Sequence, residues 1–310
     1  MKSKKKKILI VVVVLIVAVV GTVFFTANQF LSKVKKTSIS KDNESLGVTE
    51  IKGSEVTNIL LLGVDGSNKM TDSIMVLSID KKNNEVKVTS LLRDMYIYKP
   101  NGDKQQLNHA YINAGIEFAI KTVNLNFGLD IKDYIMVNMD GLIHIVDSLG
   151  GVEVNIKKEE IPYANGFIND LKLLYNIQGD YELRNPGVQN LNGIQAVSYS
   201  RIRKLDSDFE RTERQRTVLN EIFKKIKSKG TLKLPSIASS LLPYVETSLD
   251  NRSIISIAST IVSFNNKEIK QYRIPVDGTH KLLILNGLYL EDVDLEANKK
   301  YLHDFIYETK

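Results

Sequence analysis

The chain has 310 residues, of which 43% are hydrophobic and 25% are charged, and its formal net charge is +6. The sequence contains no cysteine, which excludes a thiol nucleophile and a cysteine-based zinc site. Five lysines lie within the first seven residues, and subtracting them from +6 leaves +1 for the rest, so we expect no nucleic-acid partner.

The amino terminus has the pattern of a membrane anchor. The basic stretch MKSKKKK, residues 1–7, precedes residues 8–27, which carry no charged side chain. Twenty helical residues span about 30 Å, the thickness of the hydrocarbon core of a bilayer. A cleavable signal peptide is the alternative, but it has an apolar core of about 7–15 residues and a small-x-small cleavage site, which Phe25-Thr26-Ala27 fits poorly. We therefore predict a single-pass protein of the cell membrane, with residues 1–7 in the cytoplasm and residues 28–310 outside.

The region after the anchor divides into a stalk and a domain. Residues 28–52 are polar and lack periodicity, which predicts an extracellular stalk. Residues 53–310 are enough for one self-supporting extracellular domain. The apolar run NILLLGV at 58–64 is typical of a strand that is covered on both faces. Residues 73–80 and 85–92 flank the polar turn KKNN, which predicts a hairpin.

Helices and strands then alternate to the end of the chain. The patterns predict helices at 109–127, within 139–150, and at 191–200, 208–228 and 252–264, with strands at 134–138, 151–156 and 269–275. Residues 157–190 contain scattered Pro, Gly and Asn and are expected to be irregular. We therefore predict an α/β fold with a mixed central β-sheet sandwiched between helical layers.

Arginine is concentrated in one stretch of this lysine-rich chain. Five of the nine arginines lie within SYSRIRKLDSDFERTERQR, residues 198–216. A guanidinium group is a planar fork suited to phosphate or carboxylate, whereas an ammonium group is a hydrated point charge. Arg201 and Arg203 are separated by one residue in a segment expected to be extended, so both should project to the same side.

The helix predicted at 208–228 extends this arginine group. Its apolar stripe includes Leu219, and stepping back four residues at a time reaches Gln215 and then Arg211, which should therefore face inward. Arg201, Arg203, Arg211 and Gln215 are thus candidates for binding phosphate. The alternative is a solvated surface with salt bridges to neighbouring acidic residues, and we expect that description to hold for Arg214 and Arg216.

Carboxylates follow the predicted strands at their ends. Asp65 comes directly after the first buried strand, Asp72 begins the next, and Arg93-Asp94 lies where the third strand ends. Ligands of α/β folds bind at such strand ends. Hard oxygen ligands beside a phosphate favour Mg²⁺ over zinc or copper. Taken singly, each aspartate also suits a turn or a helix cap.

Seven segments in one order together resemble the LytR-CpsA-Psr family of Gram-positive cell-envelope proteins. They are NILLLGVD, TDSIMVLSID, SLLRDMY, LNHAYINAG, MDGLIHIVDSLGGVEVNI, LNGIQAVSYSRIR and DFERTERQR, which lie between about residues 55 and 230. The resemblance implies that residues 53–310 form the catalytic domain of a phosphotransferase. Such an enzyme moves a glycopolymer, either wall teichoic acid or capsular polysaccharide, from a polyprenyl-pyrophosphate carrier in the membrane lipid onto peptidoglycan.

The resemblance also implies roles for particular residues. It places Asp65 and Asp72 at a Mg²⁺-pyrophosphate, with Mn²⁺ as the other possible metal, and makes Arg93 necessary for catalysis beside the phosphates. It implies that the pyrophosphate is bound by the four residues already named as phosphate candidates, and the lipid tail by an apolar slot between sheet and helices. Two positions depart from the family pattern, because Met70 and Gln106 stand where basic residues are frequent.

Phosphoryl transfer depends on positioning and on neutralising charge more than on a covalent nucleophile. As a hypothesis, Asp65 or Asp72 deprotonates the attacking sugar hydroxyl. Two other functions fit the same residues: a module that binds or senses polyprenyl phosphate without turnover, and a hydrolase that cleaves the pyrophosphate with water.

Overall fold

The computed structural model describes residues 33–65, 70–229, 240–264 and 268–308. The predicted cytoplasmic tail and membrane anchor, residues 1–27, lie outside these ranges. Within them, every helix is too short or too polar to cross a bilayer.

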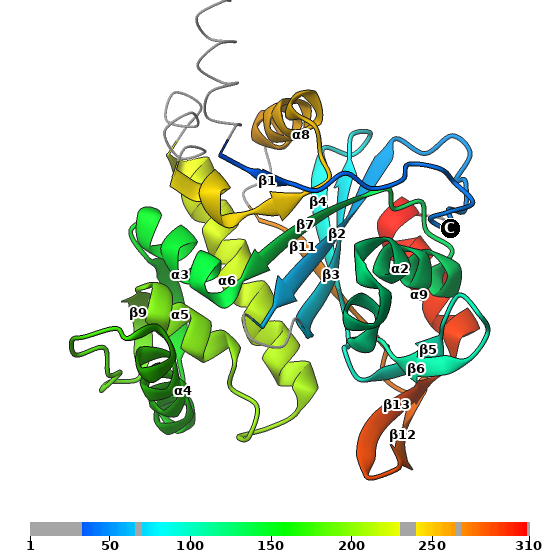
Figure 1. Cartoon of the computed structure of the whole chain (residues 1–310). Helices are drawn as coiled ribbons and strands as arrows, with labels where there is room; N and C mark the ends of the chain where they lie inside the picture. Colours follow the sequence, from blue (N-terminus) through cyan, green and yellow to red (C-terminus); the bar gives the residue numbers. More distant parts are fainter. Residues whose placement is uncertain (1–32, 66–69, 230–239, 265–267, 309–310) are drawn as a thin grey trace, which may run out of the picture.

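A mixed seven-stranded sheet forms the centre of the molecule (Figure 1). In sheet order the strands are β1 (Lys35–Lys36), β10 (Glu246–Thr247), β7 (Asp133–Asn138), β2 (Val56–Val64), β3 (Thr71–Asp80), β4 (Glu85–Leu91) and β11 (Lys270–Ile274). The β2–β7 and β4–β11 pairs are parallel, whereas β2–β3 and β3–β4 are antiparallel. The predicted mixed sheet and the hairpin at the KKNN turn are therefore confirmed.

Helices cover both faces of this sheet (Figure 1). On one face lie α2 (His109–Phe127) and α9 (Leu295–Tyr307), and on the other lie α6 (Asp208–Ser228) and α8 (Asn251–Ser263). Along β2, Leu60 packs into the first of these cores and Ile59 into the second. Both residues are fully buried. The continuous apolar run of β2 follows from this burial on two faces.

A second group of elements packs against α6. It contains α3 (Met139–Ser148), α4 (Ile161–Tyr175), α5 (Gly193–Ser200) and the two-stranded sheet of β8 (Val152–Ile156) with β9 (Gly187–Leu191). A 3-10 turn, η1 (Lys158–Glu160), connects β8 to α4. The expectation that residues 157–190 are irregular is therefore wrong. Pro162 lies in the first turn of α4, where its missing N–H is not needed, so it does not prevent a helix.

The described part of the predicted stalk packs onto the domain. Leu46 is fully buried in the core beneath α2. Its carbonyl oxygen accepts a hydrogen bond of 2.8 Å from the Asn124 side chain, and β1 adds a parallel strand beside β10. Residues from Lys33 onward are thus part of the folded unit rather than a separate spacer, because their few apolar side chains are buried in it.

A small peripheral sheet completes the described fold. It consists of β12 (His280–Leu285), β13 (Leu288–Val293), β5 (Met95–Tyr98) and β6 (Lys104–Gln106). The β12–β13 hairpin projects away from the central sheet in Figure 1. A 3-10 turn, η3 (Leu242–Tyr244), precedes β10 on the opposite side of the molecule.

Candidate active site

An apolar cavity of about 370 Å³ lies between the central sheet and the helices α3, α5 and α6. Its wall is formed by aliphatic and aromatic side chains of the sheet and of α6, including Leu61, Val88, Leu219 and Phe223. A ligand that buries apolar surface against such side chains can gain about 0.8 kcal/mol of binding free energy for each methylene group removed from water. The cavity is therefore suited to a hydrocarbon chain.

One end of the cavity is polar. Asp72 from β3, Arg201 at the carboxyl end of α5 and Gln215 from α6 all line it. The Gln215 side-chain amide lies 3.5 Å from the Asp72 carbonyl oxygen, to which it donates. Arg201 lies over the Phe167 ring, with 5.3 Å from the guanidinium carbon to the ring centroid. The cavity thus has the shape and chemistry of a site for a molecule with a charged head and an apolar tail.

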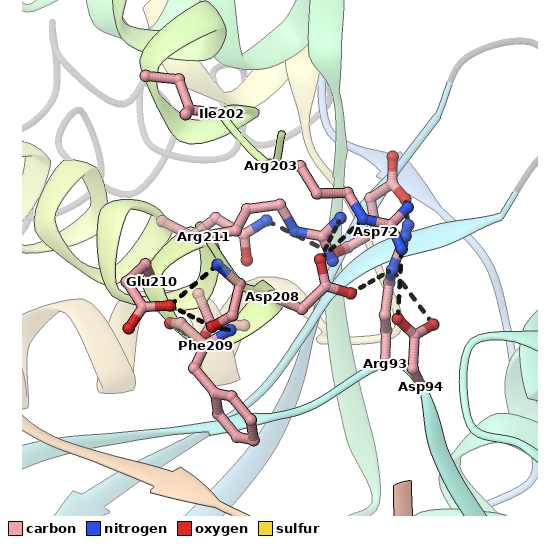
Figure 2. A network of polar contacts seen from close by, with 12 residues as sticks. Asp72, Arg93, Asp94, Ile202, Arg203, Asp208, Phe209, Glu210 and Arg211 are labelled. Carbon is pink, nitrogen blue, oxygen red and sulfur yellow. Dashed lines mark hydrogen bonds and ion pairs between the residues drawn. The ribbon is translucent and has the colours of Figure 1, made fainter. Parts of the chain in front are cut away.

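Beside this mouth, charged side chains from β3, from the β4–β5 connection, from the loop after α5 and from α6 converge on one another (Figure 2). Arg93 forms an ion pair with Asp72 through Nη1. Its Nε lies 3.4 Å from Asp94 Oδ1 and 3.6 Å from Asp208 Oδ2. Because it contacts three carboxylates, Arg93 is the central cation of the cluster.

Asp208 is the corresponding central anion. Its Oδ1 lies 3.0 Å from Arg203 Nε and 3.4 Å from Arg211 Nη1. The side chain is placed by the start of α6, where Ser207 and Glu210 form a capping box. Ser207 accepts a hydrogen bond from the amide of Phe209, and the cap fixes Asp208 in the first helical turn.

The charged groups change one another's proton affinities. Burial raises the pKa of Asp94 to about 7, and its hydrogen bond with Asp208 acts in the same direction. Burial also opposes ionisation of Asp208, but the hydrogen bond with Asp94 and the charge of Arg211 hold its pKa below the usual value. In the folded protein Asp94 therefore keeps its proton up to about pH 7, while Asp208 is ionised.

Arg211 and Arg93 are both buried, but the charges around them differ. Burial lowers the pKa of Arg211 to about 10, and the nearby charge of Arg93 contributes to this decrease. Burial also disfavours the charged form of Arg93, yet the charges of Asp94, Asp208 and Asp72 together raise its pKa above the ordinary value. The negative charge that the described residues place near Arg211 is therefore too small to offset the cost of burying its guanidinium group.

Several buried polar atoms of the cluster have no hydrogen-bond partner among the described residues. They are the guanidinium nitrogens Arg93 Nε and Arg211 Nε and Nη2, and the oxygens Asp208 Oδ1 and Gln215 Oε1. A buried donor without a partner is costly in free energy. These guanidinium donors lie close to the mouth of the apolar cavity, so an anion bound there would satisfy them.

Asp65 borders a different cavity from the one that Asp72 lines. It directly follows β2, and its amide donates to the Met70 carbonyl oxygen at 3.0 Å. Val64 and Thr71 are paired across β2 and β3, so Asp65 and Asp72 follow and begin neighbouring strands at one sheet end. Two carboxylates in these positions supply hard oxygen donors of the kind that Mg²⁺ uses together with substrate phosphates.

The prediction that Arg201 and Arg203 project to the same side of an extended segment is wrong. Arg201 ends α5 with helical backbone angles (φ −99°, ψ −7°), and the chain turns there. Consequently Arg201 lines the apolar cavity, whereas Arg203 pairs with Asp208. Both remain near the cluster, but they belong to different parts of it.

The expectation that Arg214 and Arg216 are surface charges is wrong. Their exposed fractions are 5% and 8%. Arg214 Nε lies 2.8 Å from Glu160 Oε1, and the same guanidinium binds Asp206 and donates to the Ile202 carbonyl oxygen. Helix α6 has neighbours on more than one side, so burial extends beyond the single stripe through Leu219.

Asp94 and Asp208 belong to the cluster but were not among the predicted site residues. Asp94 was placed only at the end of the third predicted strand, and Asp208 is one of the acidic residues next to the predicted surface arginines. A usable signal was present, because Asp208 precedes Arg211 by three residues and therefore shares its helix face. Gln106, at one of the two departing positions, donates to Asp94 Oδ1 at 2.7 Å.

Comparison with known proteins agrees with the fold and with these motifs. The chain is 34% identical over 270 residues to the polyisoprenyl-teichoic acid–peptidoglycan teichoic acid transferase TagU of Bacillus mycoides, covering 84% of this chain and 82% of TagU. The structure of TagT bound to LI-WTA superposes with a TM-score of 0.70 at 24% identity, covering 87% of this chain and 99% of TagT.

TagT with bound octaprenyl pyrophosphate lipid gives a TM-score of 0.64 at 21% identity, covering 87% of this chain and 99% of that one. The model of the LytR_cpsA_psr family matches residues 21–304, which is most of the sequence. The chain therefore belongs to the LytR-CpsA-Psr family.

Proposed function

We propose that this protein is a phosphotransferase that moves a glycopolymer from a polyprenyl-pyrophosphate carrier onto peptidoglycan. The observation that carries the proposal is an apolar cavity whose one charged end lies beside a cluster of arginines and aspartates. TagU is named for this reaction, and TagT has been seen with octaprenyl pyrophosphate. The glycopolymer is wall teichoic acid or a capsular polysaccharide.

The lipid-linked donor has an apolar tail and a charged pyrophosphate, and the site offers a matching region for each. The polyprenyl tail occupies the apolar cavity, and the pyrophosphate lies at the mouth among Arg93, Arg201, Arg203, Arg211 and Gln215. Arg211 has two buried nitrogens without hydrogen-bond partners among the described residues. Phosphate oxygens would satisfy them, and the gain offsets the cost of burying this cation.

Asp65 and Asp72 would hold Mg²⁺, or Mn²⁺, together with oxygen atoms of the pyrophosphate. Such a metal ion neutralises charge that develops on the phosphate oxygens. The fit rests on the position of both carboxylates at one end of β2 and β3 and on their hard oxygen chemistry.

In the transfer, the oxygen of an acceptor hydroxyl forms a bond to the phosphorus that carries the glycopolymer. The bond between this phosphorus and the oxygen of polyprenyl phosphate breaks, and the hydroxyl proton passes to Asp65 or Asp72. Arg93 stabilises negative charge in the transition state, because its guanidinium is already held in place by three carboxylates. The protein would act outside the cell, attached by the predicted anchor at residues 8–27.

A reconstituted assay tests this proposal. The full-length protein is incubated with lipid-linked glycopolymer, peptidoglycan and Mg²⁺, and products are separated with and without acceptor. We expect glycopolymer linked to peptidoglycan, and a loss of about 100-fold or more in the Asp72→Ala variant, which loses both the ion pair to Arg93 and a metal ligand.

Other products would contradict the proposal. A protein that only binds the carrier would saturate with lipid and release no product. A hydrolase would release the glycopolymer equally well without acceptor. A folded and fully active Asp72→Ala variant would refute the site assignment.

A further inference from the structure

A second cavity, of about 480 Å³, lies next to the apolar one and is polar. Val64 and Asn138 line both cavities, and these two residues are paired across the parallel strands β2 and β7. Met136 lines the second cavity, whereas its neighbours Ile135 and Val137 line the first. Because successive residues of a strand point to opposite faces, the two cavities lie on opposite faces of the sheet and meet at the carboxyl ends of β2 and β7.

The lining of the second cavity suits a neutral polyhydroxy ligand. Among the described residues that line it are the carboxylates of Asp65, Asp140 and Glu246 and one ammonium group, that of Lys35, which is paired with Glu246. The excess of negative charge disfavours a phosphate or another anion. The carboxylate oxygens are acceptors to which sugar hydroxyls can donate.

Aromatic rings provide the apolar part of this lining. Tyr244 and Tyr111 both contribute to the wall. The Tyr244 ring stacks on His144, with centroids 4.6 Å apart and planes inclined by 18°. His144 Nε2 in turn lies 3.6 Å from Asp140. The Tyr244 ring is therefore held in position by His144. Tyrosine rings pack well against the C–H faces of sugars, and their hydroxyl groups form hydrogen bonds with polar neighbours.

We propose that this second cavity binds the glycan of the acceptor, with neutral sugar rings against Tyr244 and one hydroxyl directed toward Asp65. The inference rests on the proposed transfer reaction and adds the location of its second substrate. Attacking and leaving oxygens lie roughly in line in phosphoryl transfer. The leaving polyprenyl phosphate extends into the apolar cavity on one face of the sheet, so the attacking hydroxyl should arrive from the other face.

Binding experiments with the full-length protein separate the two substrates. Tyr244→Ala and Asp140→Asn change the second cavity without touching the arginine cluster, and they avoid Glu246, which holds β1 in place. Tyr289→Ala and Asp170→Asn are matched controls, because both residues are exposed and neither lines either cavity. A tetrasaccharide of N-acetylglucosamine, the uncharged sugar of the peptidoglycan backbone, probes the acceptor cavity, and farnesyl pyrophosphate probes the donor cavity, both by calorimetry.

We expect each cavity variant to bind the tetrasaccharide at least about 10-fold more weakly, equivalent to about 1.4 kcal/mol. The affinity for farnesyl pyrophosphate and for the sugar-bearing donor should stay within about twofold of wild type. In the transfer assay, KM for the acceptor should rise while kcat changes little. The control variants should resemble wild type in all these measurements.

Two results would overturn the inference. In one, both cavity variants bind the tetrasaccharide as wild type does, or wild type does not bind it at all. In the other, they lose affinity for the sugar-bearing donor but not for farnesyl pyrophosphate, which would assign the cavity to the donor's own sugars. A wild-type protein without transferase activity would refute the proposed function. Tetrasaccharide binding needs no turnover, so the titrations would still show whether the second cavity binds a glycan.

Discussion

Helix α6 carries two buried arginines three residues apart, Arg211 and Arg214, whose surroundings differ. Arg214 binds two carboxylates, those of Glu160 and Asp206, and donates to a backbone carbonyl oxygen. Arg211 has one carboxylate contact, at 3.4 Å from Asp208, and two nitrogens without hydrogen-bond partners among the described residues. Their exposed fractions are nearly equal, at 4% and 5%.

The difference separates a structural ion pair from a binding group. The partners of Arg214 raise its pKa above the ordinary value although burial opposes them, whereas burial dominates at Arg211 and lowers its pKa. Glu160 lies at the start of α4, and Asp206 lies in the loop that follows α5. Arg214 therefore joins α4, α6 and the loop that carries Arg203. Arg211 instead remains available for an anionic ligand.

The largest expected effect is on stability, in Arg214→Met. The substitution leaves the Glu160 carboxylate buried without its cationic partner, which typically costs about 3–5 kcal/mol of the free energy of unfolding. Urea denaturation of the purified protein measures this loss. In the Glu160→Met/Arg214→Met double variant no buried charge is left over, so much of the stability should return. A single variant as stable as wild type would contradict the structural role of Arg214.

A smaller effect, on activity, is expected for Arg211→Met. The arginine is poorly compensated, and Asp208 retains its contacts with Arg203 and Arg93, so stability should change by no more than about 1 kcal/mol. Transfer should fall by about 100-fold, because a buried donor to the pyrophosphate is lost. Parallel measurements of denaturation and of reconstituted transfer distinguish the two outcomes. If Arg211→Met unfolded as easily as Arg214→Met, the distinction between the two arginines would fail.

The smallest effect concerns pH, and it compares Asp94 with its amide analogue. The pKa of Asp94 is about 7 in the folded protein against an ordinary value of 3.8, so the folded state binds the proton more tightly. This contribution to stability is complete below about pH 4 and is lost as the pH rises toward 7. Between pH 5 and pH 8 the urea midpoint of wild type should therefore fall more than that of Asp94→Asn. Equal changes in the two midpoints would contradict this assignment of the proton.

Periodicity in the sequence predicts the buried face of a helix correctly where the helix packs against a single neighbouring element. The helix at 208–228 and the inward phase of Arg211 are confirmed. The same four-residue step from Val218 leads back to Arg214, which is buried too. The prediction counted only from Leu219 and so found one buried face. Helix α6 packs against the sheet, α5 and β8, so more than one of its faces is buried.

The sequence also contains a turn signal for a hairpin that we did not predict. Asn286-Gly287 connects β12 and β13, and such a pair between apolar runs is a strong hairpin signal. The prolines and glycines of 157–190 had the opposite effect, because they suggested irregular chain although Pro162 only begins α4. Local residue types indicate where a turn is possible, while packing against α5 decides which of these segments becomes a helix.

By itself the sequence determined the alternation of strands and helices, the family, and the concentration of arginine near residue 211. These features depend on residues close together in the chain, whose spacing is fixed by the geometry of a helix or strand. Only the tertiary structure decided that Arg214 is bound to Glu160, that the pKa of Asp94 is raised beside Asp208, and that two cavities meet at Val64 and Asn138. Those features arise from residues that are distant in sequence, and their charges and burial are set by three-dimensional neighbours.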